Sequence, residues 1–177
     1  SSDVCSSDLR KINLYSDRFK ESLSFDLSEI DGLAADCPTG HWRDFVAGCL
    51  KLQGAAIPSG LDILIDQNIT GGGLSSSASF SIALSQLLWW ADGRPAMTDE
   101  ALRMLARTCQ QVEQEYVGLN CGIMDQFSVA LGDILSLDCQ TQTWERLSAP
   151  DQMTLIVLDT GVPRTLAASA YNTRVEE

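Results

Sequence analysis

Basic side chains are scarce in this sequence of 177 residues, which has 12 Lys and Arg against 24 Asp and Glu and a formal net charge of −12. A surface of this sign repels phosphate backbones, so we expect no nucleic-acid partner bound through a broad basic face. The same charge repels a nucleotide. Any phosphate chemistry must therefore depend on a local site built from backbone amides and a metal ion.

Long apolar runs and closely spaced cysteines are absent too. The longest apolar run, residues 82–91, is interrupted by Ser85 and Gln86 and is too short to span a bilayer, so we expect no membrane contact. No cysteine pair has the short spacing typical of a metal site, and reduced thiols in a cytoplasmic protein are the simplest interpretation. The six cysteines are Cys5, Cys37, Cys49, Cys109, Cys121 and Cys139.

The first nine residues do not read as the start of a fold. Residues 1–9 contain the triplet Ser-Ser-Asp twice and lack the apolar core of a signal peptide, so we interpret them as a non-native leader. Hydrophobic residues make up 45% and charged residues 20% of the chain, which is the balance of a globular protein. We expect residues 10–160 to form part of one domain and residues 161–177 to begin a second.

Hydrophobic periodicity predicts a mixture of helices and strands. Thr98 is a predicted helix N-cap, and Asp99 and Glu100 follow it where acidic side chains complement the helix dipole. The mixture predicts an α+β or α/β domain without internal repeats. The predicted helices are residues 42–52, 75–91, 98–116 and 122–131, and the predicted strands are residues 61–66, 134–137 and 155–158.

A glycine- and serine-rich loop connects the strand predicted at 61–66 to the helix predicted at 75–91. Its glycines let the backbone approach a ligand closely, and the free amide groups at a helix start attract phosphate. A serine hydroxyl at this point is also a suitable ligand for Mg²⁺. The loop consists of Gly71, Gly72, Gly73, Leu74, Ser75, Ser76 and Ser77.

The loop also has a simpler interpretation, as a flexible glycine turn followed by serines that cap a helix. Its position between a strand and a helix favours phosphate binding over that alternative. The loop is not a P-loop, because it lacks the Gly-Lys-Ser/Thr ending and the lysine that would reach the phosphates. Another type of phosphate-binding loop is therefore indicated.

A second segment, residues 118–127, places a carboxylate near the start of a predicted helix. Gly122 leaves room for a substrate, and Asp125 can accept a proton from an attacking hydroxyl or orient that hydroxyl toward a phosphoryl group. Alternatively, Asp125 only complements the helix dipole. The spacing alone favours this second interpretation.

Both segments resemble motifs of the GHMP kinases, in the form found in galactokinases. Residues 71–80 are similar to the phosphate-binding motif of that family, with Ile69 in place of its usual proline. Residues 121–126, Cys-Gly-Ile-Met-Asp-Gln, are similar to the galactokinase active-site segment. This resemblance implies that Asp125 is the catalytic base and that the backbone of Gly122 faces the sugar.

The resemblance implies roles for four further residues. Glu113 and Ser77 match the family's magnesium ligands. Tyr171 lies in a stretch, residues 158–174, that is similar to the segment where galactokinases enter their second domain, and it matches a sugar-contacting tyrosine. Trp42 resembles a position near the adenine pocket. For Tyr171 and Trp42, ordinary packing of an aromatic ring is an equally simple interpretation.

The fold implied by the resemblance is a GHMP-kinase-type N-terminal α/β domain, with a mixed sheet packed by helices in an α+β arrangement. The implied reaction transfers the γ-phosphoryl group of ATP, with Mg²⁺, to the anomeric hydroxyl of galactose. Related kinases for N-acetylgalactosamine or arabinose are alternatives, as is a sensor that binds galactose and ATP without turnover. The intact loop and Asp125 favour an enzyme over a sensor.

Galactokinases also have a segment of the type Gly-Arg-Val-Asn-Leu-Ile-Gly-Glu-His-Thr-Asp-Tyr, which binds the sugar and places an arginine beside the transferred phosphate. Residues 11–14 are too short a likeness to match it. We therefore expect this chain to be an internal part of a galactokinase-like kinase. Because a transition-state cation contributes strongly to phosphoryl transfer, we expect the chain alone to be inactive. We also expect strands of the first domain to be missing, which would leave sheet edges exposed.

Overall fold

The computed structural model describes residues 10–33, 35, 38–53, 57, 60–67 and 73–158. Helices and strands alternate irregularly along this part of the chain. The strands are β1 (Lys11–Ser16), β2 (Glu21–Asp26), β3 (Leu61–Ile65), β4 (Ile134–Asp138) and β5 (Thr143–Leu147). The helices are the 3₁₀ turn η2 (Ile30–Gly32), α1 (Trp42–Gln53), α2 (Ser76–Ala91), α3 (Asp99–Gln111), the π-helical turn η3 (Val112–Tyr116) and α4 (Met124–Leu131).

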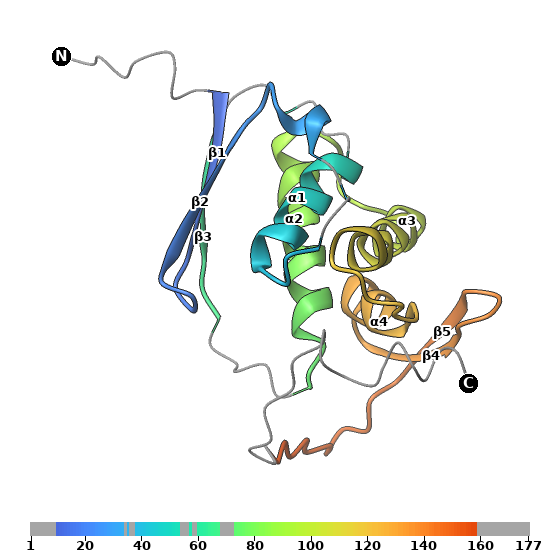
Figure 1. Cartoon of the computed structure of the whole chain (residues 1–177). Coiled ribbons are helices and arrows are strands. Elements are labelled where there is room, and N and C mark those ends of the chain that lie inside the picture. Colours follow the sequence, from blue (N-terminus) through green and yellow to red (C-terminus); the bar gives the residue numbers. More distant parts are fainter. Residues whose placement is uncertain are drawn as a thin grey trace.

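Three strands form a mixed sheet in the order β2-β1-β3. β1 pairs with β2 in antiparallel register, Leu14 opposite Leu23, and with β3 in parallel register, Leu14 opposite Ile63. Strict alternation along β1 buries Ile12 and Leu14 on one face, as expected for a strand with one buried side. Figure 1 shows α1 and α2 covering that face, with the other face of the sheet left open.

The helices and the sheet enclose two apolar clusters. The first lies between the sheet and helices α1 and α2, and its members include Ile12, Val46 and Leu88. The second lies between α2, α3, α4 and the β4-β5 hairpin, where the Phe127 and Trp144 rings meet edge to face with centroids 6.0 Å apart. Each fully buried aliphatic or aromatic side chain contributes roughly 1.5–3 kcal/mol by leaving water. These clusters fix α2, α3 and α4 relative to one another.

The predicted fold class and most of the predicted elements are confirmed. The helices expected at 42–52, 75–91 and 122–131 and the strands expected at 61–66 and 134–137 are present with small differences at their ends. Thr98 caps α3, because its side chain accepts a hydrogen bond from the amide of Ala101 at 3.3 Å. Among the described residues no helix is long and apolar enough to cross a bilayer.

The strand predicted at 155–158 is wrong. These residues form no helix or strand, and Leu155 and Leu158 are 80% and 84% exposed. Apolar composition gives a segment the propensity to be a strand, but a strand forms only where a neighbouring strand accepts its hydrogen bonds. Within the described residues, nothing pairs with this segment.

Other differences concern elements that the sequence did not indicate. β1, β2 and β5 were not predicted, since β2 and β5 contain several polar residues and their burial depends on their pairing partners. The helix expected to continue to Tyr116 changes to a π-helical turn at Val112. The predicted leader, residues 1–9, and the predicted second domain, residues 161–177, lie outside the described residues, so those predictions stay untested.

Candidate active site

The N-terminus of α2 follows a backbone with two left-handed residues. Gly73 has φ +84° and Ser75, the residue before the helix, has φ +52°. A left-handed conformation is unfavourable for serine, as it is for the three other described non-glycine residues that adopt it, Lys20, Asp133 and Gln142. Ser75 makes no side-chain cap hydrogen bond, and the first turn of α2 contains no acidic residue. No acidic side chain of α2 itself therefore neutralises the positive end of its dipole. This favours binding of a phosphate there.

The π-helical turn η3 places Glu113 in the interior. Its widened geometry is marked by the hydrogen bond from the amide of Val117 to the carbonyl of Val112, five residues earlier, at 3.3 Å. Glu113 is only 4% exposed, although it follows directly on a surface helix. Single π-turns within α-helices are frequent at functional sites, because they redirect a side chain without breaking the helix. The local backbone therefore supports a functional position for Glu113.

The carboxylate of Glu113 accepts side-chain hydrogen bonds from three different elements. Ser77 donates from the first turn of α2, Cys121 donates from the loop before α4, and Gln126 Nε2 donates from α4 to Glu113 Oε1 at 3.0 Å. Burial raises the pKa of Glu113, and the three donors partly offset this effect. A buried carboxyl group from η3 therefore lies at the N-terminus of α2.

Asp125 lies close to this buried carboxylate. Its negative charge contributes to the raised pKa of Glu113, after the larger effect of burial. Asp125 occupies the first turn of α4 and is half-buried, whereas Gly122, in the loop before it, is exposed. Both sequence interpretations of Asp125 remain compatible with this position, since the first turn of a helix also favours an acidic side chain.

Glutamine side chains fix the loop that leads to α4. Gln110 Nε2 and Gln114 Nε2 both donate to the backbone carbonyl of Cys121, at 3.0 and 3.1 Å. The contacts of these two glutamines and of Gln126 were not predicted in the sequence analysis. A spacing of four residues puts Gln110 and Gln114 on one side of a helix, which is the signal that was available, but it does not say what they bind.

The donor atoms present fit a magnesium ion bound together with phosphates. Ser77 and Glu113 offer a hydroxyl and a carboxylate in mutual hydrogen-bond contact, which are hard oxygen ligands. Among the described residues no group of three or more His, Cys, Asp or Glu could hold a metal by itself. Mg²⁺ commonly binds to one or two protein ligands and completes its coordination shell with water and substrate phosphates.

The structure does not bring every predicted site residue together. Gly71, Gly72 and Tyr171 lie outside the described residues. Trp42 is 8% exposed; its Nε1 donates to Glu21 Oε2 at 2.8 Å, and its ring stacks on Phe19 with centroids 5.9 Å apart. These contacts account for Trp42 as a packing residue, and a role near adenine stays a prediction.

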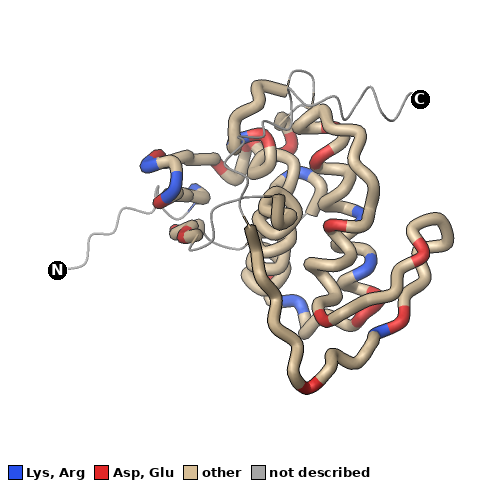
Figure 2. The backbone as a smooth tube through the Cα atoms, turned by 90° about the horizontal axis from the view of Figure 1, so that it is seen from below, with Lys and Arg blue, Asp and Glu red and all other residues tan. Residues whose placement is uncertain are grey.

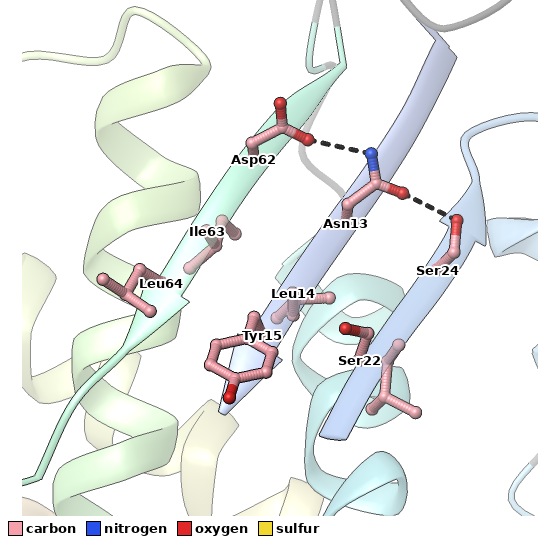
Figure 3. A pocket seen from close by; sticks show the side chains of 9 residues that line it. Asn13, Leu14, Tyr15, Ser22, Ser24, Asp62, Ile63 and Leu64 are labelled. Carbon is pink, nitrogen blue, oxygen red and sulfur yellow. Dashed lines mark hydrogen bonds between the residues drawn. The ribbon is translucent and has the colours of Figure 1, made fainter. Parts of the chain in front are cut away.

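A hollow of about 540 Å³ lies elsewhere, on the open face of the sheet (Figure 3). Asn13, on the central strand β1, donates a hydrogen bond to Asp62 and accepts one from Ser24, both at 2.8 Å. These hydrogen bonds tie the three strands together through side chains. The hollow contains none of the residues of the candidate active site.

Charge is distributed in agreement with a local rather than a broad phosphate site. Figure 2 shows basic residues interspersed with acidic ones along the helices. The four described cysteines, Cys49, Cys109, Cys121 and Cys139, are free thiols, as predicted.

Comparison with known proteins agrees with this fold. Residues 44–133 match the GHMP kinases N terminal domain, a region that contains α2, η3 and α4. Since this match covers half of the chain, the chain belongs to the GHMP kinase family.

Within that family the chain is similar to galactokinase. It is 35% identical over 172 residues to the galactokinase of Thermococcus kodakarensis, with 93% of this chain and 46% of that protein covered. The chain therefore spans less than half the length of this relative.

Two solved structures share the fold. A crystal structure of mevalonate kinase matches with a TM-score of 0.62 at 21% identity, over 78% of this chain and 43% of the other. Mevalonate kinase from Methanococcus jannaschii matches with a TM-score of 0.61 at 22% identity, over 82% and 44%. At this level of identity the likeness establishes the architecture alone.

Proposed function

We propose that the protein containing this chain transfers the γ-phosphoryl group of ATP to the anomeric hydroxyl of galactose. The observation that carries the proposal is the meeting of Ser77, Glu113 and Asp125, from three helical segments, beside the N-terminus of α2. A phosphate-binding helix start, a pair of oxygen ligands and a second carboxylate are the groups that phosphoryl transfer needs. The similarity to a galactokinase supports galactose as the acceptor.

In this proposal each group has a distinct task. The first amides of α2 and the loop before it bind the phosphates of ATP, and Ser77 and Glu113 bind the metal ion. When bound, Mg²⁺ supplies positive charge to the phosphate oxygens. Asp125 accepts the proton of the attacking sugar hydroxyl or orients that hydroxyl in line with the γ-phosphorus. Catalysis then depends on positioning and charge rather than on a covalent intermediate.

The sugar and adenine contacts are further parts of the proposal. Gly122 is exposed in the loop before Asp125, where the absence of a side chain leaves space for a sugar. We propose Tyr171 as a second sugar contact and Trp42 as a residue near the adenine. N-acetylgalactosamine and arabinose are alternative acceptors, which the test below compares directly.

The test is ADP release by the full-length gene product that contains this chain, with each of the three sugars. The Asp125→Asn variant removes the proton acceptor and should lower kcat on galactose by about 10²–10⁴-fold. Asp151→Asn, which changes an exposed carboxylate after β5, is the matched control and should not affect turnover. Sugar-dependent turnover that survives in Asp125→Asn would contradict the role of Asp125.

Two further outcomes decide between the alternatives. Faster turnover with N-acetylgalactosamine or arabinose than with galactose would reassign the acceptor. Tight binding of galactose and nucleotide without ADP release would overturn the enzyme and favour a ligand-binding sensor. Either result can be read from the same assay combined with calorimetric binding of the sugar.

A further inference from the structure

Gln126 is a buried amide with half of its hydrogen-bonding capacity unused. Its side chain lies in α4 and is 1% exposed. Its Nε2 donates to Glu113 Oε1 at 3.0 Å and lies 3.8 Å from Cys121 Sγ. Among the described residues, nothing donates to its Oε1. An unsatisfied buried acceptor costs about 1–3 kcal/mol, so an apolar side chain of the same volume would stabilise this position better.

The hydrogen bond to Glu113 gives a reason for this unfavourable amide. A carboxylate that is to bind a metal must keep its charge and a fixed orientation. A neutral amide donor fixes the carboxylate without neutralising it, whereas Arg or Lys would compete with the metal and Asp or Glu would repel the carboxylate. Glutamine therefore holds the carboxylate in a fixed orientation, which a metal ligand needs and which core packing alone does not require.

The same hydrogen bond links the turn that carries Glu113 to the helix that carries Asp125. Gln126 follows Asp125 directly in α4, and successive residues of an α-helix point about 100° apart. Asp125 is accordingly half-buried at the edge, while Gln126 is directed inward to Glu113. The link between Gln126 and Glu113 thus fixes η3, with its metal ligand, against the helix that carries Asp125.

We propose that Gln126 is a positioning residue that holds Glu113 in the orientation needed to bind the metal of a metal–nucleotide complex. This inference rests on the proposed function for the role of Glu113 as a ligand. It assigns Gln126 no contact with the sugar or with the transferred phosphoryl group. Removing its amide should therefore affect metal binding more than sugar binding.

The test replaces Gln126 by Met, which has a similar volume and cannot donate a hydrogen bond, in the full-length gene product. Binding of Mn²⁺ in the presence of ADP is followed by electron paramagnetic resonance, which needs no turnover. Loss of groups that orient a metal ligand typically weakens metal binding 10–100-fold, and we expect a loss in this range for Gln126→Met. The KM for sugar, where turnover is measured, should change by less than about twofold, since Gln126 acts through Glu113.

Phe127→Leu is the matched control, because Phe127 is fully buried in the same helix and packs against Trp144. It should lower the melting temperature without weakening Mn²⁺ binding. An equal loss of Mn²⁺ binding in both variants would show a general folding defect and overturn the inference. Gln126→Leu, of similar volume, replaces the Met variant if that variant does not fold.

The outcomes separate this inference from the proposed function. Unchanged Mn²⁺–ADP affinity in a folded Gln126→Met or Gln126→Leu protein overturns the positioning role, whatever the substrate. A wild-type protein that phosphorylates none of the sugars, but binds Mn²⁺–ADP in a way that depends on Gln126, overturns galactose phosphorylation and supports the positioning role.

Discussion

A Cβ atom added to Gly48 would lie 2.7 Å from Cγ1 of Val112 and 3.0 Å from Cγ of Tyr116. Carbon atoms that are not bonded prefer separations of about 3.5–4.0 Å. Gly48 lies in α1, and Val112 and Tyr116 are the two ends of the π-helical turn that carries Glu113. The close approach of α1 to η3 therefore depends on a residue without a side chain.

The first prediction follows from this contact. Gly48→Ala should destabilise the protein by about 1–2 kcal/mol, because the cost of overpacking exceeds the gain in helix propensity. Equilibrium unfolding in urea measures this change. Gly32→Ala is the control, since nothing lies within 4 Å of a Cβ at Gly32, and it should change stability by less than about 0.5 kcal/mol. Equal stabilities of the two variants would contradict the close packing of α1 on η3.

The second prediction concerns the hydroxyl that donates to Glu113. Ser77→Ala removes one hydrogen bond to a charged group and one proposed metal ligand. Loss of a group that binds or orients a metal typically weakens metal binding 10–100-fold, so we expect the affinity for Mn²⁺–ADP to fall by roughly this factor. Ser79→Ala, on an exposed face of the same helix, should leave this affinity unchanged. Equal affinities for the Ser77 and Ser79 variants would remove Ser77 from the site.

The third prediction concerns the ion pair that joins α3 to β5. Arg146 donates two hydrogen bonds to Asp99, at 2.6 and 2.9 Å, and these bonds hold the pKa of Asp99 below its ordinary value of 3.8. A carboxyl with a lowered pKa in the folded state stabilises the protein above its unfolded pKa, and this contribution is lost as the pH falls through the folded pKa. Asp99→Asn should therefore lower the melting temperature slightly at pH 7 and have no effect well below pH 3.8.

Melting curves by circular dichroism between pH 7 and pH 2.5 test this dependence. Asp31→Asn is a suitable control, because the Asp31 side chain is fully exposed and its Oδ1 lies as far as 3.7 Å from Lys51 Nζ. Surface pairs of that kind contribute little. A difference between wild type and Asp99→Asn that persists at the lowest pH would exclude the ion pair as its cause.

The fourth prediction concerns thiol reactivity. Burial raises the pKa of Cys121 to about 12 from its ordinary 9.0, which leaves roughly a thousandfold less thiolate at pH 8. Cys139 is exposed. Alkylation by iodoacetamide at pH 8 should therefore modify Cys139 first and Cys121 much more slowly. Mass spectrometry of the labelled peptides measures both rates, and similar rates in the native protein would contradict the buried contact of Cys121 with Glu113.

Much of the fold follows from local features of the sequence. Thr98 caps a helix because a hydroxyl at that position accepts an orphan amide hydrogen bond, and this chemistry needs no distant partner. The strand at 155–158 fails for the opposite reason, because a strand exists only through the partner that pairs with it. β2, with many polar residues, was missed because its burial depends on the neighbouring elements, whereas the alternation of Ile12 and Leu14 in β1 is a local signal that was available.

For the candidate site, the sequence by itself determined the types of residue and their local positions. The order glycine loop, helix start, Glu113 and Asp125 can be read from the sequence, since short-range geometry and a family resemblance place each of them. The tertiary structure decided which groups meet and what fixes them. The π-helical turn, the close approach at Gly48 and the contact of Gln126 with Glu113 join residues distant in sequence. Such contacts depend on the packing of α1, α2, η3 and α4, which no local pattern specifies.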